Sequence, residues 1–125
     1  LHDRADMFFR PEEGAWIEGD MTDKAEHILV SRFADGSDPD PLSLLFFTDC
    51  VPPTVFALYG EAGWVPTLEL TVQIRAIPAP GDLLCRFTTR YLTNGLLEED
   101  GEIWDSNNQL VALSRQLAKY RRPTK

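Results

Sequence analysis

The sequence predicts a single α+β domain in which a curved antiparallel sheet wraps around one central helix. Its 125 residues are enough for one domain with a hydrophobic core. Helical spacing of apolar residues, with start and stop signals, occurs in one segment, residues 40–50. From residue 67 onward, apolar and polar residues alternate instead, as they do in half-buried antiparallel strands.

The first part of the chain predicts a leader followed by a strand. Residues 1–24 are acidic, contain proline and glycine, and keep no sustained period, so we expect a leader or linker remnant there. Within it, residues 15–17 have strand character. Residues 26–33 are rich in Ile, Val and Phe and predict the first strand. The domain itself is therefore expected to span residues 25–125.

Signals at both ends define the predicted helix. Asp40 is a favourable N-cap, and Pro41 suits the first helical position, where its missing N–H costs nothing. A Pro-Pro pair follows Val51 and disfavours helical geometry, so the helix should end near Cys50. One or two further helical turns are expected over residues 53–59.

Four long strands follow, joined by turns rich in proline, glycine and asparagine. They are expected over residues 67–76, 83–91, 96–104 and 110–120. One short helix cannot cover so long a sheet by lying against part of it. A strongly curved sheet wrapped around the helix fits this order of elements best, and that architecture is the hotdog fold.

Composition excludes several classes of protein. The net charge of −8 argues against nucleic-acid binding, which requires a concentrated basic face. No apolar run approaches the ~20 residues of a membrane span, and no signal peptide is visible. His2 and His27 have no partner at zinc-like spacing, so no metal site is expected. Cys50 and Cys85 are expected to be buried free thiols, which suits a cytoplasmic protein.

One carboxylate falls on an apolar face of the predicted helix. Leu42, Leu45, Phe46 and Asp49 share a face at helical spacing, and we expect this face to pack against the sheet. Burying an unpaired acid is costly. Asp49 therefore either tips into solvent at the helix end or serves as a buried general base.

Two polar residues of the predicted strands are candidates to act with this carboxylate. Gln116 lies among small residues of the last strand, where its amide either caps a buried backbone group or holds a water or a carbonyl group. Thr67 opens the first alternating strand, and its hydroxyl either has no special role or orients the same water. By simple alternation, Thr67 shares a polar face with Glu69 and Thr71.

The chain resembles the C-terminal half of acyl-CoA thioesterase II, the TesB-like double-hotdog family, in three stretches: LSLLFFTDCVPPTVF, WVPTLELTVQIRAIPAPGDLL and LEEDGEIWDSNNQLVALSRQLA. The resemblance covers about residues 25–120 and implies a catalytic set of Asp49, Thr67 and Gln116. It implies hydrolysis of a fatty acyl-CoA thioester by a water that these residues hold and activate. It also implies no cofactor, since coenzyme A is part of the substrate.

The resemblance further implies how the substrate is held. The acyl chain would lie along the helix among Leu and Phe side chains. The phosphates of coenzyme A would meet exposed basic side chains, for which the candidates are Arg75, Arg86, Arg90 and Arg121.

The chain departs from the family in length, because members usually carry two tandem hotdogs and this chain contains one. A lone hotdog leaves a sheet edge uncovered. We therefore expect a second hotdog domain as partner, either from self-association or from another half. An acyl-CoA-binding hotdog without hydrolysis and a non-catalytic half that completes an assembly stay open as alternatives. A hydratase of this fold normally uses an Asp-His pair, and no histidine accompanies Asp49.

Overall fold

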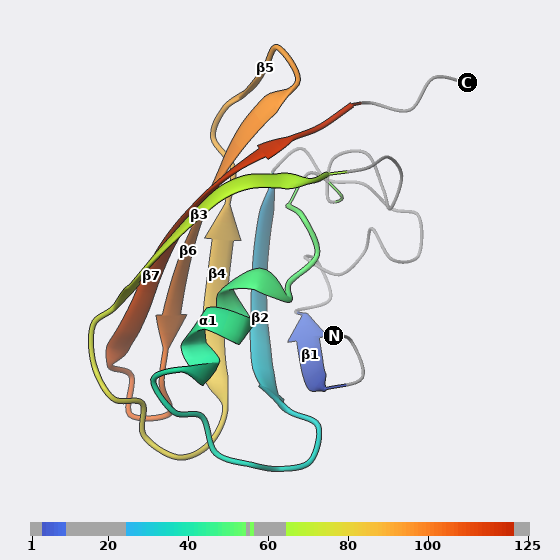
Figure 1. Ribbon diagram of the computed structural model, residues 1–125. Helices are drawn as coiled ribbons and strands as arrows, with labels where there is room; N and C mark the ends of the chain where they lie inside the picture. The colour runs from blue at the N-terminus through green and yellow to red at the C-terminus, as the bar shows by residue number, and fades with distance from the viewer. Residues whose placement is uncertain (1–3, 10–24, 55, 57–64, 122–125) are drawn as a thin grey trace.

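The computed structural model describes residues 4–9, 25–54, 56 and 65–121. The elements in chain order are β1 (Ala5–Phe9), β2 (Glu26–Phe33), α1 (Ser43–Asp49), β3 (Thr67–Ile74), β4 (Leu83–Thr88), β5 (Leu92–Thr93), β6 (Leu96–Trp104) and β7 (Leu110–Lys119). The predicted α+β class and the hotdog architecture are confirmed, because α1 lies against the concave face of a curved sheet (Figure 1). The predictions for residues 15–17 and for most of residues 53–59 lie outside the described residues.

The sheet has seven strands, and every described pair is antiparallel. Its order is β1-β2-β4-β6-β7-β3, with β5 paired to the start of β6. The strand that follows the helix in sequence, β3, therefore lies beside the last strand, β7, at one edge of the sheet (Figure 1). The concave face is the one that α1 covers.

Alternation in the sequence becomes alternation of burial in the strands. In β4, Leu83, Cys85 and Phe87 are buried and the residues between them are exposed. This strand ends at Thr88, before the predicted end at residue 91. The cause is local: Arg90 and Tyr91 donate their backbone N–H groups to the Glu98 carboxylate, at 2.9 and 2.8 Å, and so leave the ladder.

The core fills the space between α1 and the sheet. Phe47 of α1 is fully buried, and its ring lies 4.8 Å from that of Phe33 and 5.2 Å from that of Phe46. Strand β6 comes close to the Phe87 ring of β4, because Gly101 of β6 faces that ring and has no side chain. A Cβ at Gly101 would lie 2.5 Å from the Phe87 ring. The buried residues of this main cluster are Ala5, Leu29, Leu44, Phe47, Cys50, Leu83, Cys85, Phe87, Ile103, Val111 and Ala112.

The prediction of Asp40 as N-cap and Pro41 as first helical residue is wrong, because α1 starts at Ser43 and Leu42 is its N-cap. Asp40 instead bonds Ser43 across the turn that precedes the helix. Its carboxylate accepts the backbone N–H of Ser43 at 2.7 Å, and the Ser43 hydroxyl accepts the N–H of Asp40 at 2.8 Å. This reciprocal pair satisfies donors that the first turn of a helix leaves unbonded. The helix ends at Asp49, next to the predicted end near Cys50.

The prediction of which helix face packs on the sheet is wrong. Leu44, Phe47 and Thr48 are buried in α1, whereas Leu42 and Leu45 are 75% and 44% exposed. Apolar residues occupy both sides of this helix, so their spacing does not distinguish the face that meets the sheet. The face that carries Asp49 looks outward.

Part of the predicted leader belongs to the sheet. Residues Ala5–Phe9 form β1, which pairs with β2 from Ala5 opposite Phe33 to Phe9 opposite Leu29. Met7 and Phe9 pack against the core, which explains why so short a segment is ordered as a strand. The prediction of a leader without regular structure is therefore wrong for these five residues.

Candidate functional site

Asp49 is the last residue of α1 and is exposed, so the prediction of a buried general base is wrong in its burial. The helix that ends at Asp49 lies against β3 and β6 of the sheet. The charge of Asp49 is one of the influences that raise the pKa of Glu99, a buried residue of β6. The end of the helix therefore brings one exposed acid close to one buried acid.

Gln116 of β7 faces the same side of the sheet as Glu99. The two residues are direct partners across β6 and β7, and Gln116 is also paired with Leu70 of β3. Direct partners in an antiparallel ladder project from the same face. Glu99 points to the same face of β6 as the buried residues Leu97 and Ile103, so this shared face is the one that α1 covers. Gln116 is half-buried there.

Thr67 reaches this face because of a β-bulge. Thr67 pairs with Ala118 and Glu69 pairs with Leu117, so one extra residue, Leu68, interrupts the register. A bulge of this kind changes which way the flanking side chains point. Thr67 therefore shares the face of Ala118 and Gln116, and Leu68 is half exposed. The predicted common face for Thr67 and Glu69 is wrong, because simple alternation does not anticipate the extra residue.

The three predicted catalytic residues thus come from one side of the sheet. Thr67 and Gln116 are on neighbouring strands, and Gln116 is two residues from Ala118, the partner of Thr67. Asp49 ends the helix, and its charge contributes to the raised pKa of Glu99 of β6. Sequence reasoning missed Glu99. Its signal was present, since Glu99 has the same parity as Leu97 and Ile103 and was bound to point inward with them.

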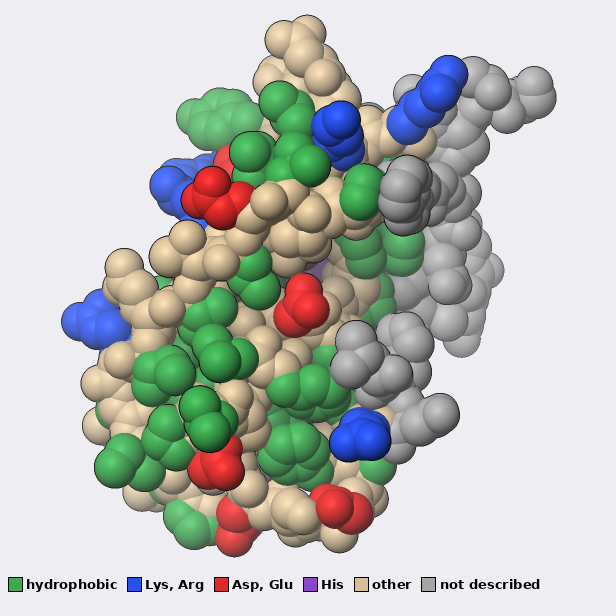
Figure 2. Space-filling view, in the orientation of Figure 1, with side chains coloured by type: hydrophobic (Ala, Val, Ile, Leu, Met, Phe, Trp, Pro, Cys, Tyr) green, Lys and Arg blue, Asp and Glu red, His purple; other side chains and the backbone are tan. Residues whose placement is uncertain are grey.

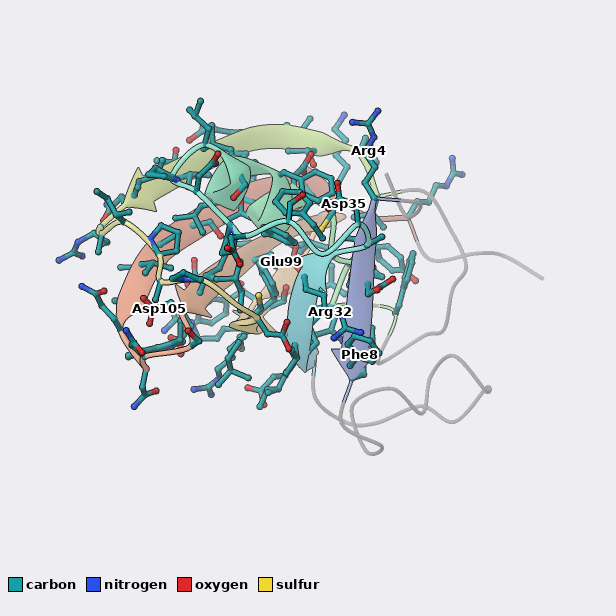
Figure 3. The ribbon with its side chains drawn as sticks, turned by 90° about the horizontal axis from the view of Figure 1, so that it is seen from below. Arg4, Phe8, Arg32, Asp35, Glu99 and Asp105 are labelled. Atoms are coloured by element: carbon teal, nitrogen blue, oxygen red, sulfur yellow. The ribbon has the colours of Figure 1, made fainter. Side chains whose placement is uncertain are left out.

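The environment of Glu99 explains its proton affinity. The side chain is buried, and Oε1 accepts the backbone N–H of Thr54 at 3.2 Å. The pKa of Glu99 is raised to about 7: burial is the largest cause, the charges of Asp49 and Glu98 act in the same direction, and the backbone and side-chain hydrogen bonds of Thr54 oppose them. Figure 3 shows Glu99 in the interior of the molecule. This carboxyl changes its protonation near neutral pH.

The chain immediately after α1 is fixed to three parts of the sheet. The Nε2–H of His27, in β2, donates to the carbonyl of Pro53 at 3.1 Å. Thr54 donates to Glu99 through its backbone, and its hydroxyl is 2.6 Å from that of Thr89. His27 and Thr54 are fully buried. Because these bonds lie just past Asp49, they also fix the end of the helix.

The four candidate phosphate-binding arginines separate into two groups. Arg86 pairs with Glu26 at 3.0 Å, and Arg90 pairs with Asp100 at 3.2 Å. Arg75 and Arg121 are exposed and form no ion pair with the described part of the chain. Arg121 follows β7 just beyond the residue that pairs with Thr67, whereas Arg75 follows the opposite end of β3.

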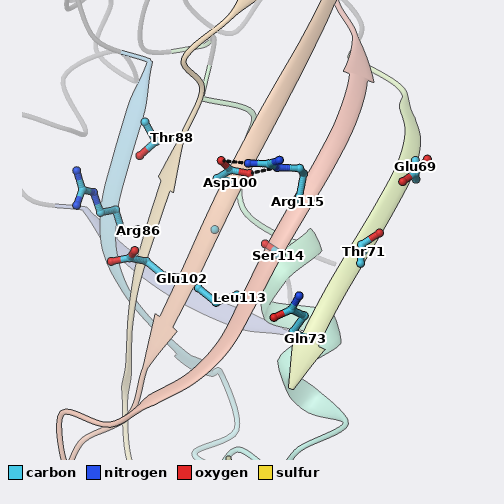
Figure 4. A pocket seen from close by; sticks show the side chains of 11 residues that line it. Glu69, Thr71, Gln73, Arg86, Thr88, Asp100, Glu102, Leu113, Ser114 and Arg115 are labelled. Atoms are coloured by element: carbon cyan, nitrogen blue, oxygen red, sulfur yellow. Dashed lines mark hydrogen bonds and ion pairs between the residues drawn. The ribbon is translucent and has the colours of Figure 1, made fainter. Parts of the chain in front are cut away.

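A cavity of about 520 Å³ lies on the other face of the sheet, away from the helix (Figure 4). Its lining residues are Glu69, Thr71, Gln73, Arg86, Thr88, Asp100, Gly101, Glu102, Leu113, Ser114 and Arg115. Arg115 donates to both oxygens of Asp100, at 2.7 and 2.9 Å, and holds the pKa of Asp100 below its usual value. None of the three predicted catalytic residues lines this cavity.

The two cysteines have no part in this site. Both are buried and free, as predicted. Burial raises the pKa of Cys50 to about 11 and that of Cys85 to about 12, so both are protonated thiols at neutral pH. Among the described residues, no three His, Cys, Asp or Glu side chains gather as metal ligands. No described helix has the length and hydropathy needed to cross a membrane.

Comparison with known proteins places the chain in a family. Residues 1–119 match the model of the acyl-CoA thioesterase C-terminal domain. A candidate thioesterase II from Thermobifida fusca YX superposes with a TM-score of 0.86 at 36% identity, over 96% of this chain and 47% of that one. A hotdog protein of unknown function from Alicyclobacillus acidocaldarius has a TM-score of 0.84 at 20% identity, over 96% of this chain and 46% of that one.

The sequence relatives, like these solved structures, are much longer than this chain. An uncharacterized protein of Mycobacterium tuberculosis H37Rv is 36% identical over 83 residues, which are 66% of this chain and 28% of that protein. The chain thus spans less than half the length of the relatives that it resembles. The family match over nearly all residues, together with the TesB-like hotdog architecture, shows that the chain belongs to the acyl-CoA thioesterase C-terminal domain family.

Proposed function

We propose that this domain hydrolyses the thioester of fatty acyl-CoA to a free acid and coenzyme A. The family supports thioester hydrolysis in general. The observation that supports the specific site is the strand register, since the bulge at Leu68 brings Thr67 to the face of Gln116, and α1 ends over that face at Asp49.

In the proposed reaction, the Asp49 carboxylate takes a proton from a water molecule. The oxygen of this water adds to the thioester carbonyl carbon, the C–S bond then breaks, and the thiol leaves with a proton. The Gln116 amide and the Thr67 hydroxyl hold the water or the carbonyl group. Backbone N–H groups stabilise the negative charge that develops on the carbonyl oxygen. No covalent enzyme intermediate forms.

The substrate would extend in two directions from this point. The acyl chain would lie along α1, against the exposed Leu45 and the half-buried Phe46. Of the four predicted arginines, we favour Arg121 for the phosphates of coenzyme A. It forms no ion pair with the described residues and follows the strand end that pairs with Thr67, whereas Arg86 and Arg90 are already paired with acids.

We further propose that a second hotdog domain covers the β3 side of this one. A patch of exposed apolar side chains, here called the β3-side patch, runs along the outward face of α1 and the edge strand; its members are Leu42, Leu45, Leu68, Ile74 and Ile77. Figure 2 shows hydrophobic side chains gathered beside α1 and β3. A contiguous exposed apolar surface next to an open sheet edge is typical of a protein interface.

The test is release of free thiol from a series of acyl-CoA substrates by the purified protein. Asp49→Asn keeps the shape of the side chain and removes its basic function, so hydrolysis should fall at least ~100-fold. Gln116→Ala should cost less, and the double variant should cost less than the two single changes combined. Asp82→Asn is the matched control: Asp82 is an exposed acid in the turn before β4, outside the proposed site, and its replacement should leave turnover unchanged.

Two results would contradict the proposal. Unchanged turnover in Asp49→Asn would remove Asp49 as the base. Binding of acyl-CoA without thiol release by the wild-type protein would favour a non-catalytic half.

A further inference from the structure

Two acidic side chains are buried among the described residues, and they are bonded very differently. The Asp105 carboxylate accepts three backbone N–H groups, from Ala79, Asn107 and Gln109, at 2.9 to 3.0 Å. It closes the turn between β6 and β7. Glu99 accepts one backbone N–H, from Thr54, whose side chain also helps to stabilise the carboxylate. A buried acid with one backbone donor is less well compensated for its lost hydration than an acid with three.

The place of Glu99 suggests why such an acid is present. Its hydrogen bond reaches from β6 to Thr54, five residues beyond Asp49. Its register partner is Gln116. One side chain therefore connects the chain after the helix end to the strand pair that carries Gln116. Helix α1, which ends at Asp49, also contacts β6, and the charge of Asp49 contributes to the raised pKa of Glu99.

We propose that Glu99 is the positioning residue of the candidate site, which holds the helix end in place through Thr54 and favours proton transfer to Asp49 by its negative charge. The inference rests on the proposed function and adds a residue to it. When Asp49 takes a proton, negative charge moves from Asp49 to the thioester oxygen. An anion beside Asp49 favours that movement, whereas a neutral side chain does not.

The polar and titratable groups around Glu99 come from four segments and from its own strand. Asp49 approaches it from α1, Thr54 from the segment after α1, and Gln116 from β7. Glu98 acts from the other side of its own strand. His27 of β2 lies in the same buried layer, bonded to Pro53. Of these, Asp49 is the charged group that comes from an opposing element.

The first experiment is the pH profile of kcat/KM from pH 5 to 9. In the wild type, the rate should rise severalfold as Glu99 ionises near pH 7. Glu99→Gln keeps an acceptor for the Thr54 N–H and should lose this rise while KM stays the same. Glu102→Gln makes the same change on the opposite face of β6 and should keep the wild-type profile. Parallel profiles for Glu99→Gln and the wild type would overturn the proposal.

The second measurement does not need turnover. The side-chain carboxyl of Glu99 is followed by carbon NMR during a pH titration, in the wild type and in Asp49→Asn. Removing the neighbouring charge should lower the titration midpoint of Glu99, whereas Asp82→Asn should leave it in place. An unshifted midpoint in Asp49→Asn would refute the interaction of the two acids. A shifted midpoint in a protein without thioesterase activity would support the interaction and refute the proposed function alone.

Discussion

Replacement of Glu99 by glutamine should change the stability of the fold in a way that depends on pH. The pKa of Glu99 is about 7 in the folded protein, against 4.5 for the same group in an exposed chain. The folded state therefore binds this proton more tightly than the unfolded state does. Stability should fall as pH rises from about 4.5 to about 7, and should then stay constant above it.

The magnitude follows from the difference between the two pKa values. One pKa unit corresponds to about 1.4 kcal/mol, so ionised Glu99 should make the folded state about 3 kcal/mol less stable than protonated Glu99. Glutamine does not titrate and can still accept the Thr54 N–H. Glu99→Gln should thus match the wild type within about 0.5 kcal/mol near pH 4.5, the usual size of a neutral substitution. It should exceed the wild type by about 3 kcal/mol at pH 8.

Urea denaturation of both proteins at pH 4.5, 6 and 8 gives these free energies directly. Glu102→Gln serves as the control, since its side chain lines the outer cavity and should show no such divergence. A difference between Glu99→Gln and the wild type that stays constant across this range would refute the reasoning. It would mean that Glu99 is solvated in the folded protein and that its proton affinity is ordinary.

Three further substitutions test other parts of the structure. Gly101→Ala should destabilise the fold by about 1–3 kcal/mol in urea denaturation, because its Cβ would overlap the Phe87 ring; wild-type stability would contradict the packing described. Asp105→Ala should speed hydrogen exchange at Asn107 and Gln109, and its destabilisation should shrink as pH falls below 3.8, because the unfolded chain then takes up a proton that the folded carboxylate, with its lowered pKa, binds less tightly; equal effects at pH 3 and 7 would exclude this role. Leu45→Glu, in the β3-side patch, should shift sedimentation toward the monomer, and an unchanged oligomeric state would exclude this patch as the interface.

The strands could be predicted from sequence because their signal is local. Alternation of apolar and polar residues within β4 matches burial on one face, and no distant residue is needed to detect it. The same alternation in the edge strand β3 leaves none of its residues buried. The hydrogen bond between Asp40 and Ser43 is also local, since the two residues are three positions apart. The short strand β1 lacked such a signal and owes its order to packing of Met7 and Phe9 on the core.

The orientation of the site residues could not be predicted, for reasons that are not local. Helix α1 has apolar residues on both sides, and only the shape of the sheet decides that Leu44 and Phe47 face inward and Asp49 outward. The role of Glu99 depends on Thr54, 45 residues away in sequence. The parity of β6 could have indicated that Glu99 points inward, but the role of a buried acid can be inferred only when its neighbours are known.

The extra residue at Leu68 gives this domain an economical route by which activity can be gained or lost in evolution. Straightening the bulge, so that Leu68 paired with Ala118, would move Thr67 one position along β7 and turn it to the outer surface, while β3 and β7 stayed paired from Glu69 onward. Every residue of the proposed set would still be present in such a lineage. Homologues that retain Asp, Thr and Gln at these positions can therefore differ in activity through the backbone between Thr67 and Glu69, and the presence of the bulge is the feature by which they would be told apart.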